Sequence, residues 1–223
     1  FHSLTPKLKV KVGDIVKAGS SLFFNKSNDK INFCSPVSGK VTDIVRGEKR
    51  KILEVVVAAD DDIIYEKFNI SSHKDLSREQ IIDSMLKGGV WPFIRQKPYD
   101  VIASPSDMPK AIFISAFKSA PLSIDNDFAL YGMEELFQKG LDYIIKLTRG
   151  KTHLNIDGNT NMSKVFGSCK GVVINKFSGP HPAGNVGVQI HHLDPINKGD
   201  IIWYLEPQDV IVIARLFTEG KYD

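Results

Sequence analysis

The chain has 223 residues, of which 42% are hydrophobic and 25% are charged, and its formal net charge is +3. This length allows one or two domains with a sizeable core, and the ordinary composition excludes wholesale disorder. The 29 basic and 26 acidic residues are interspersed. Because nucleic-acid binders cluster lysine and arginine on one face, we expect no nucleic-acid partner. No apolar run in the sequence approaches the length of a transmembrane helix.

Residues 1–62 have the pattern of short β-strands. Apolar and polar residues alternate in "LKVKVGDIVKAGSSLFF" and again in "INFCSPVSGKVTDIV", and glycine or proline interrupts both stretches. Such spacing is typical of a small β-sandwich or barrel. The polar, acidic stretch that follows predicts a connector over residues 63–74.

Beyond the connector, helical and strand patterns alternate. Ser77 and Gln80 have the spacing of a capping box, and the glycine pair Gly88-Gly89 is a typical helix end. The continuous apolar run Lys110–Phe117 predicts a buried strand. This alternation favours a Rossmann-like α/β domain with a mostly parallel sheet over residues 75–223.

Further elements complete the predicted α/β domain. An amphipathic helix starting near Met133 is expected to close at Gly150. The stretches "THLNI", "SKVFGSC" and "GVVIN" predict strand, helix and strand. The closing run "DIIWYLEPQDVIVIARLF" is interrupted by Pro207 and predicts two C-terminal strands around that proline.

The N-terminal part resembles the biotinyl/lipoyl carrier domain, in which "GDxVxxG" and "SPxxGxV" frame a hairpin that carries a modified lysine. Lys30 is the candidate counterpart. Only five positions separate Lys30 from Ser35, fewer than in the carrier family. We therefore expect Lys30 to lie away from the hairpin tip, in a barrel retained without a prosthetic group. A carrier domain with a modified Lys30 remains an alternative.

The segment "FSGPHPAGNVGVQIHHLDP" looks like a site and is interpreted as a loop shaped by glycine and proline. Gly179 and Gly184 are spaced as in a P-loop, but the lysine that would neutralise terminal phosphates is missing. Neighbouring His191 and His192 diverge in a helix and lie on opposite faces of a strand, so they are poor joint metal ligands. We expect no metal site and no catalytic residue here. His181, His191 and His192 are kept as candidate polar contacts.

Two cysteines, Cys34 and Cys169, lie far apart in the sequence and form no CxxC pair. Two structural thiols in a reducing compartment are the favoured interpretation, and a cross-link is the alternative.

Longer stretches carry a specific resemblance over essentially the whole chain. They are "PKLKVKVGDIVKAG…SPVSGKVTDIVRGEKRK", "GGVWPFIRQKPYDVIA…PKAIFISAF…APL", "FSGPHPAGNVGVQIHHLDPINKGDIIW" and "LFTEGKYD". They resemble the A subunit of the sodium-translocating NADH:quinone oxidoreductase. Members of that family are longer at both ends, so the resemblance implies a fragment that lacks the N-terminal and C-terminal regions.

The same family is similar to the flavin-binding subunit of respiratory complex I, where a glycine-rich "GRGGAGFPTG" loop and an acidic "E-x-E-P" segment hold FMN and NADH. The corresponding stretches here are "KGGVWPFIRQ" and "AFKSAP". Bulky residues such as Trp91 and Phe93 replace glycines that let backbone approach the flavin, and Lys118 lies where acids are expected. We therefore expect an eroded flavin site. An FMN-binding NADH dehydrogenase module of the complex I type is the alternative function.

The resemblance implies a non-catalytic, peripheral subunit on the cytoplasmic face of the bacterial inner membrane, without a redox cofactor of its own. FMN, FAD, riboflavin, iron–sulfur and NADH are expected in partner subunits, and ubiquinone is the expected ligand. A quinone needs an apolar slot with donors for its carbonyl oxygens. The candidate contacts are Trp91, Phe93, Arg95, His181 and His191. The aromatic side chains could equally fill the former flavin cavity as core.

Overall fold

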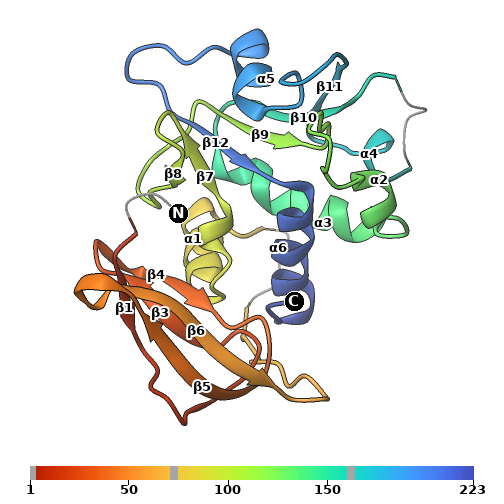
Figure 1. Cartoon of the computed structure of the whole chain (residues 1–223). Helices are drawn as coiled ribbons and strands as arrows, with labels where there is room; N and C mark the ends of the chain where they lie inside the picture. Colours follow the sequence, from red (N-terminus) through yellow and green to blue (C-terminus); the bar gives the residue numbers. More distant parts are fainter. Residues whose placement is uncertain (1–3, 71–74, 160–163) are drawn as a thin grey trace. The chain divides into compact units, whose positions relative to one another are not determined.

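A computed structural model describes residues 4–70, 75–159 and 164–223. The chain forms two compact units (Figure 1). The first unit comprises Phe1–His73, Ile82–Pro92 and Arg215–Asp223, and the second comprises Lys74–Ile81 and Phe93–Ala214. Both units are therefore discontinuous in sequence. The linear boundaries expected from the sequence, 1–62, 63–74 and 75–223, stay a prediction.

The N-terminal part of the first unit consists of strands, as predicted. They are β1 (Pro6–Leu8), β2 (Ile15–Val16), β3 (Ser21–Asn25), β4 (Asn28–Cys34), β5 (Gly39–Arg46) and β6 (Ile52–Ala59), with the short 3-10 turn η1 (Glu48–Arg50) between the last two. Two antiparallel three-stranded sheets form, β1-β3-β4 and β2-β5-β6. Buried Val16, Leu22 and Val41 form their core. The alternation of apolar and polar residues in the sequence therefore reflects strands that bury one face.

Lys30 is exposed on β4. The pairing of Asn25 with Asn28 places the hairpin turn before Lys30. The prediction that Lys30 lies away from the hairpin tip is therefore confirmed.

Helix α1 (Arg78–Lys87) begins and ends as predicted. The Ser77 backbone N–H donates to Gln80 Oε1 over 2.8 Å, and the Gln80 N–H donates to Ser77 Oγ over 3.3 Å. Gly89 follows the helix with φ +72°, a conformation that strains any residue with a Cβ. A Cβ at Gly89 would also lie 2.2 Å from Cys34 Sγ. Local sequence chemistry therefore determines both ends of this helix.

The second unit is built on a six-stranded sheet with the order β11-β10-β9-β12-β7-β8 (Figure 1). Strands β9 (Ala111–Ser115), β10 (Thr152–Asp157), β11 (Val173–Phe177) and β12 (Ile202–Leu205) are parallel. Strands β7 (Arg95–Lys97) and β8 (Val101–Ile102) extend the sheet antiparallel beyond β12. Every residue of β9 is buried. The mostly parallel sheet with a buried central strand is confirmed.

Helices precede, connect and follow these strands. They are η2 (Trp91–Phe93), α2 (Asn126–Ala129), α3 (Glu134–Ile144), η3 (Ile145–Leu147), α4 (Lys164–Gly167), α5 (Val186–Leu193) and α6 (Pro207–Glu219). The predicted strand–helix–strand order of β10, α4 and β11 is confirmed. The expected closure of α3 at Gly150 is wrong, because the helix ends at Ile144 and a 3-10 turn follows. Gly150 has another role, since a Cβ there would lie 1.9 Å from the Lys110 carbonyl oxygen.

The prediction of two C-terminal strands around Pro207 is wrong. Strand β12 is present, but Pro207 is the first residue of helix α6. Proline suits this position because its fixed φ is helical and its missing N–H would have no partner there. Buried residues recur at helical spacing in α6: Val210, Ile213, Ala214 and Phe217. A continuous apolar run does not distinguish a buried helix from a buried strand by periodicity alone.

Within residues 4–70, 75–159 and 164–223, no helix is long and apolar enough to cross a bilayer.

Candidate functional site at the carboxyl end of the parallel sheet

Strand order reverses beside β9. Strands β10 and β11 follow on one side of β9, whereas β12 lies on its other side. In open parallel sheets, ligands bind outside the carboxyl ends of the strands at such a reversal. The segments that follow β9, β10 and β12 are therefore the first place to seek a site.

A cavity of about 270 Å³ lies at this edge of the second unit. Its walls come from the segment after β9, from the end of β10, and from the region of α2 and α4. The lining residues are Ala116, Phe117, Lys118, Ser123, Ile124, Asp125, Asn126, Asp127, Ile156, Asp157 and Phe166. The cavity therefore combines carboxylates with apolar and aromatic side chains.

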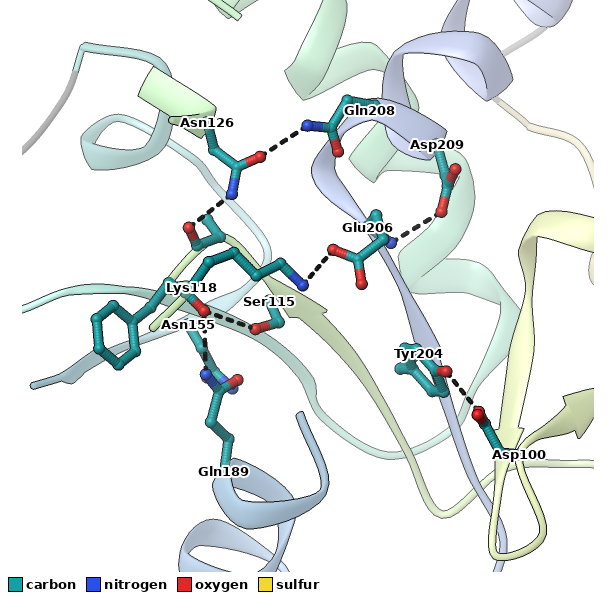
Figure 2. Close-up of polar contacts among 12 residues, drawn as sticks. Asp100, Ser115, Lys118, Asn126, Asn155, Gln189, Tyr204, Glu206, Gln208 and Asp209 are labelled. Atoms are coloured by element: carbon teal, nitrogen blue, oxygen red, sulfur yellow. Dashed lines mark hydrogen bonds and ion pairs between the residues drawn. The ribbon is translucent and has the colours of Figure 1, made fainter. Parts of the chain in front are cut away.

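A buried amide network contacts the segment that follows β9 (Figure 2). Asn155 of β10 donates from Nδ2 to Gln189 Oε1 of α5 over 2.9 Å, and both side chains are fully buried. Asn175 Nδ2 of β11 donates to Asn155 Oδ1 over 2.9 Å. Gln189 Nε2 donates to the carbonyl oxygen of Phe117 over 3.4 Å. The network therefore ties β10, β11 and α5 to the segment that follows β9.

A second set of contacts connects the ends of β9 and β12. Lys118 forms an ion pair with Glu206, which directly follows β12 (Figure 2). Gln208 Nε2 of α6 donates to Asn126 Oδ1 over 2.8 Å, and Asn126 Nδ2 donates to the Ala116 carbonyl oxygen over 2.8 Å. Because Glu206 neutralises Lys118, this ammonium is a poor partner for a phosphate group.

Asp209, in the first turn of α6, has an unusual charge environment. Its Oδ2 accepts the Glu206 backbone N–H over 2.9 Å. The pKa of Asp209 is raised from 3.8 to about 7, mainly by burial; the Glu206 carboxylate also raises it, whereas the hydrogen bond from the Glu206 N–H and the charges of Lys118 and Arg95 lower it. Asp209 therefore changes its protonation near neutral pH, next to the Lys118–Glu206 pair.

Three aspartates give the cavity a negative character. Asp125 Oδ1 accepts the backbone N–H groups of Asp127 and Phe128 over 3.0 and 3.1 Å. Asp157 Oδ1 accepts the N–H of Asn159 over 2.8 Å. Asp127 Oδ1 is buried and has no hydrogen-bond partner among the described residues. Since the one lysine of the lining is paired with Glu206, the cavity favours a group that donates hydrogen bonds or carries positive charge.

The residues predicted to contact quinone have different environments. Trp91 is fully buried in η2, and Phe93 is half-buried. Arg95 of β7 donates from Nη2 to the Asp100 carbonyl oxygen over 2.7 Å, and its guanidinium lies 3.5 Å from the Asp100 carboxylate. None of these three residues lines the cavity. Their contact with quinone stays a prediction.

The histidines lie in two parts of the segment that was predicted to be a loop. His181 is exposed before α5, and its Nδ1 lies 3.3 Å from Ser119 Oγ. His191 and His192 are exposed on α5, with ring centroids 5.7 Å apart and planes at 71°. The loop prediction is therefore wrong for Val186–Leu193, which is helical, with Gln189 and Ile190 buried one turn after the partly buried Val186. Within the described ranges, no group of three or more His, Cys, Asp or Glu residues is placed to hold a metal ion.

Cys34 and Cys169 are both free. Burial raises the pKa of Cys34 to about 12 and that of Cys169 to about 11. Both groups are therefore protonated thiols at neutral pH, as expected for structural rather than nucleophilic cysteines.

Two domains of one protein family match consecutive parts of the chain. The NqrA N-terminal barrel-sandwich hybrid domain matches residues 1–60, and the NqrA second alpha/beta domain matches residues 76–222. The chain belongs to the NqrA family. This membership confirms the predicted resemblance, the barrel-sandwich class of the N-terminal part and the α/β class of the rest.

Members of the NqrA family from several bacteria are similar over nearly the whole chain. The proteins of Hahella chejuensis (strain KCTC 2396) and Yersinia pestis are each 37% identical over 223 residues, which is 99% of this chain and 49% of theirs. The protein of Histophilus somni (strain 2336) is 36% identical over 99% of this chain and 50% of its own length. All three are named as the A subunit of Na(+)-translocating NADH-quinone reductase. The chain spans about half the length of these relatives.

Sequence reasoning missed the amide pair of this NqrA chain, Asn155 and Gln189. The only sequence signal was a polar residue between two apolar ones, in "LNI" and in "VQI". A fully buried amide must find partners, so such an isolated polar residue is a usable indicator of a network.

Gly184 explains part of the glycine pattern that resembled a P-loop. A Cβ at this position would lie 2.2 Å from the Ser119 backbone nitrogen and 2.7 Å from the Lys118 carbonyl carbon. The Gly184 N–H donates to Ser119 Oγ over 2.8 Å. Glycine is therefore needed at this position for the close approach of two backbones beside the cavity.

We expect the substitution Gly184→Ala to displace the Lys118–Ser119 backbone and to lower the free energy of unfolding by about 1–3 kcal/mol. Gly187→Ala is the matched control, because a Cβ at Gly187 in α5 meets nothing within 4 Å. Alanine also favours a helix, so the control should be neutral or stabilising by up to about 1 kcal/mol. Urea unfolding measures both variants. Equal stability of the two would contradict the close-approach argument.

Proposed function

We propose that this chain serves as a peripheral, non-catalytic part of a sodium-translocating NADH:quinone reductase. The observation that supports the proposal is that both NqrA domains match in order, with relatives of the same name 37% identical over 99% of the chain. In this role the chain lies on the cytoplasmic face of the membrane and supplies docking surface for other subunits. Those subunits carry the flavins, iron–sulfur, NADH site and sodium path.

The proposal includes a relationship to the flavin-binding subunit of complex I in which this chain has lost its flavin. Trp91 and Pro92, in the stretch that corresponds to the glycine-rich flavin loop, are both buried side chains. They occupy space where a flavin subunit keeps backbone alone. The cavity beside Lys118 has three carboxylates and one neutralised lysine. This charge disfavours the phosphate of FMN, so the residues present do not fit the cofactor.

Ubiquinone contact is a separate part of the proposal. The candidate contacts are Trp91, Phe93, Arg95, His181 and His191. Quinone carbonyl oxygens accept hydrogen bonds, and Arg95 and the histidines supply donors. Photo-affinity labelling of the assembled complex with a quinone analogue should mark peptides that carry these residues. Labels confined to other subunits would overturn this part and leave the subunit role untouched.

The subunit role is tested by purifying the full-length protein through an affinity tag from solubilised membranes of its own host. We expect flavin-bearing subunits and NADH:quinone reductase activity to co-purify with it. After separation from these partners, the protein should lack the visible absorption bands of flavin. A protein that purifies alone, with stoichiometric FMN and its own NADH dehydrogenase activity, would establish the complex I type of module instead.

A further inference from the structure

A short segment of the second unit exposes several large apolar side chains to solvent. Leu122 is 100% exposed, Phe128 is 83% exposed, Tyr131 is 78% exposed and Ile124 is 53% exposed. These four residues lie within ten consecutive positions around α2, which we call the 122–131 segment. Scattered exposed apolar residues need no explanation, but a concentration of this kind marks an interaction site.

The charged residues along this part of the sequence have one sign. Asp125, Asp127, Glu134 and Glu135 lie within or directly after it, and no lysine or arginine occurs between Ser119 and Gln138. An anionic membrane surface would be repelled by these carboxylates, whereas a basic protein segment would be attracted. Charge complementarity therefore favours a cationic protein partner.

The acidic cavity next to this segment offers a binding site for such a cationic side chain. Ser123, Ile124, Asp125, Asn126 and Asp127 of the 122–131 segment line the cavity. The buried oxygen of Asp127 without a described partner is an acceptor that a guanidinium or ammonium group would satisfy.

The rest of the wall fits the stem of a long basic side chain. Asp157 adds a second carboxylate, while Ile156, Phe117 and Phe166 add apolar surface. Lysine and arginine bury their methylene groups against such surface while their charged end pairs with carboxylates. A free phosphate compound is disfavoured, because Lys118 is already paired with Glu206.

We propose that the 122–131 segment and the adjoining cavity form a docking site for a partner protein segment that presents a lysine or arginine between apolar residues. The cationic side chain enters the cavity and pairs with Asp127 and Asp157, and its apolar neighbours cover Leu122 and Phe128. This inference rests on the proposed function, because the partner is another subunit of the same membrane complex.

The test measures binding of the purified full-length protein to membranes from a strain that lacks it, by sedimentation at increasing protein concentration. One variant, Leu122→Ser/Phe128→Ser, removes exposed apolar surface, and another, Asp127→Asn/Asp157→Asn, removes charge while keeping acceptor oxygens. Tyr99→Ser is the matched control for the first, since Tyr99 is 84% exposed elsewhere on the second unit. Asp61→Asn/Asp62→Asn, at two exposed aspartates of the first unit, is the control for the second.

We expect each docking variant to bind about tenfold more weakly, or worse, and both controls to bind as wild type. Added salt should weaken membrane binding of the wild-type protein more than that of Asp127→Asn/Asp157→Asn, because salt screens ion pairs. Leu122 is fully exposed, so Leu122→Ser alone keeps the test valid if another variant fails to fold.

Three outcomes would count against these ideas in different ways. Wild-type protein that fails to bind the depleted membranes would overturn the proposed function. Wild-type binding with undiminished binding of the docking variants would overturn only the docking site. Equally tight binding to protein-free vesicles of anionic lipid, lost in Leu122→Ser/Phe128→Ser, would identify a lipid-binding surface and overturn the protein partner.

Discussion

The substitution Asn155→Leu is expected to lower the free energy of unfolding by roughly 3 kcal/mol. Leucine has a similar size but offers no hydrogen bonds, and Asn155 is fully buried. The change removes the donor to Gln189 Oε1 and the acceptor for Asn175 Nδ2. Buried polar groups left without partners lose their hydration and gain nothing in return. The loss should also loosen the segment after β9 through Gln189 and the Phe117 carbonyl oxygen.

A double-mutant cycle distinguishes this network from simple packing. In Asn155→Leu/Gln189→Met both amides are absent, so neither is left as a buried group without its partner. The double variant should therefore lose less stability than the sum of the two single variants. Chemical denaturation of all four proteins gives the coupling free energy. If Asn155→Leu costs less than about 1 kcal/mol, or if the two changes are additive, the network does not support the site as described.

The second large effect concerns the pH dependence of stability through Asp209. The pKa of this carboxyl is raised to about 7 in the folded protein, from an ordinary value of 3.8. Between these values the folded state holds a proton that the unfolded state has lost, so stability falls as pH rises from about 4 to about 7. Above this window the penalty is constant and on the order of 2–4 kcal/mol.

Asp209→Asn should remove this penalty, because the amide oxygen can still accept the Glu206 N–H and carries no charge. We expect the variant to be more stable than wild type at pH 8, with little difference at pH 4, so that its stability curve is flatter across this range. Thermal unfolding over the pH series measures the effect, and a carbon NMR titration of the Asp209 carboxyl locates its midpoint. Curves of stability against pH that stay parallel for the wild-type protein and the variant would contradict the raised pKa of Asp209.

The sequence predicted best the elements whose signals are local. The capping box of Ser77 and Gln80 and the glycines after α1 act within a few residues, so they can be recognised without tertiary information. The buried strand β9 was recognisable because strands covered on both faces are continuously apolar. The same property caused the error at α6, where an apolar run of similar composition is a helix that begins at Pro207.

The candidate site was less predictable, because strand order and long-range contacts create it. Nothing in the residues near Lys118 indicates that β12 lies beside β9 and brings Glu206 to it. Likewise, Asn155 and Gln189 are 34 positions apart and meet only in the folded sheet. On α5, the adjacent His191 and His192 attract attention in the sequence and are exposed, whereas Gln189 of the same helix is buried and was missed.

Together these contacts support the proposal that the α/β unit serves as a docking surface. At the reversal point beside β9, the Lys118–Glu206 ion pair and the Asn126–Gln208 hydrogen bond connect the ends of β9 and β12. The neighbouring cavity is acidic and is bordered by exposed apolar residues. Such a surface is suited to a protein partner.

The central claim is that this chain belongs to a working sodium pump, and NADH-driven sodium uptake into inverted membrane vesicles tests it most directly. Vesicles from a strain that lacks the protein should neither reduce quinone in a sodium-dependent way nor accumulate sodium. Adding back the full-length protein should restore both activities, whereas the Leu122→Ser/Phe128→Ser variant should restore them only at higher protein concentration. Sodium uptake that is normal in vesicles without the protein would contradict the account.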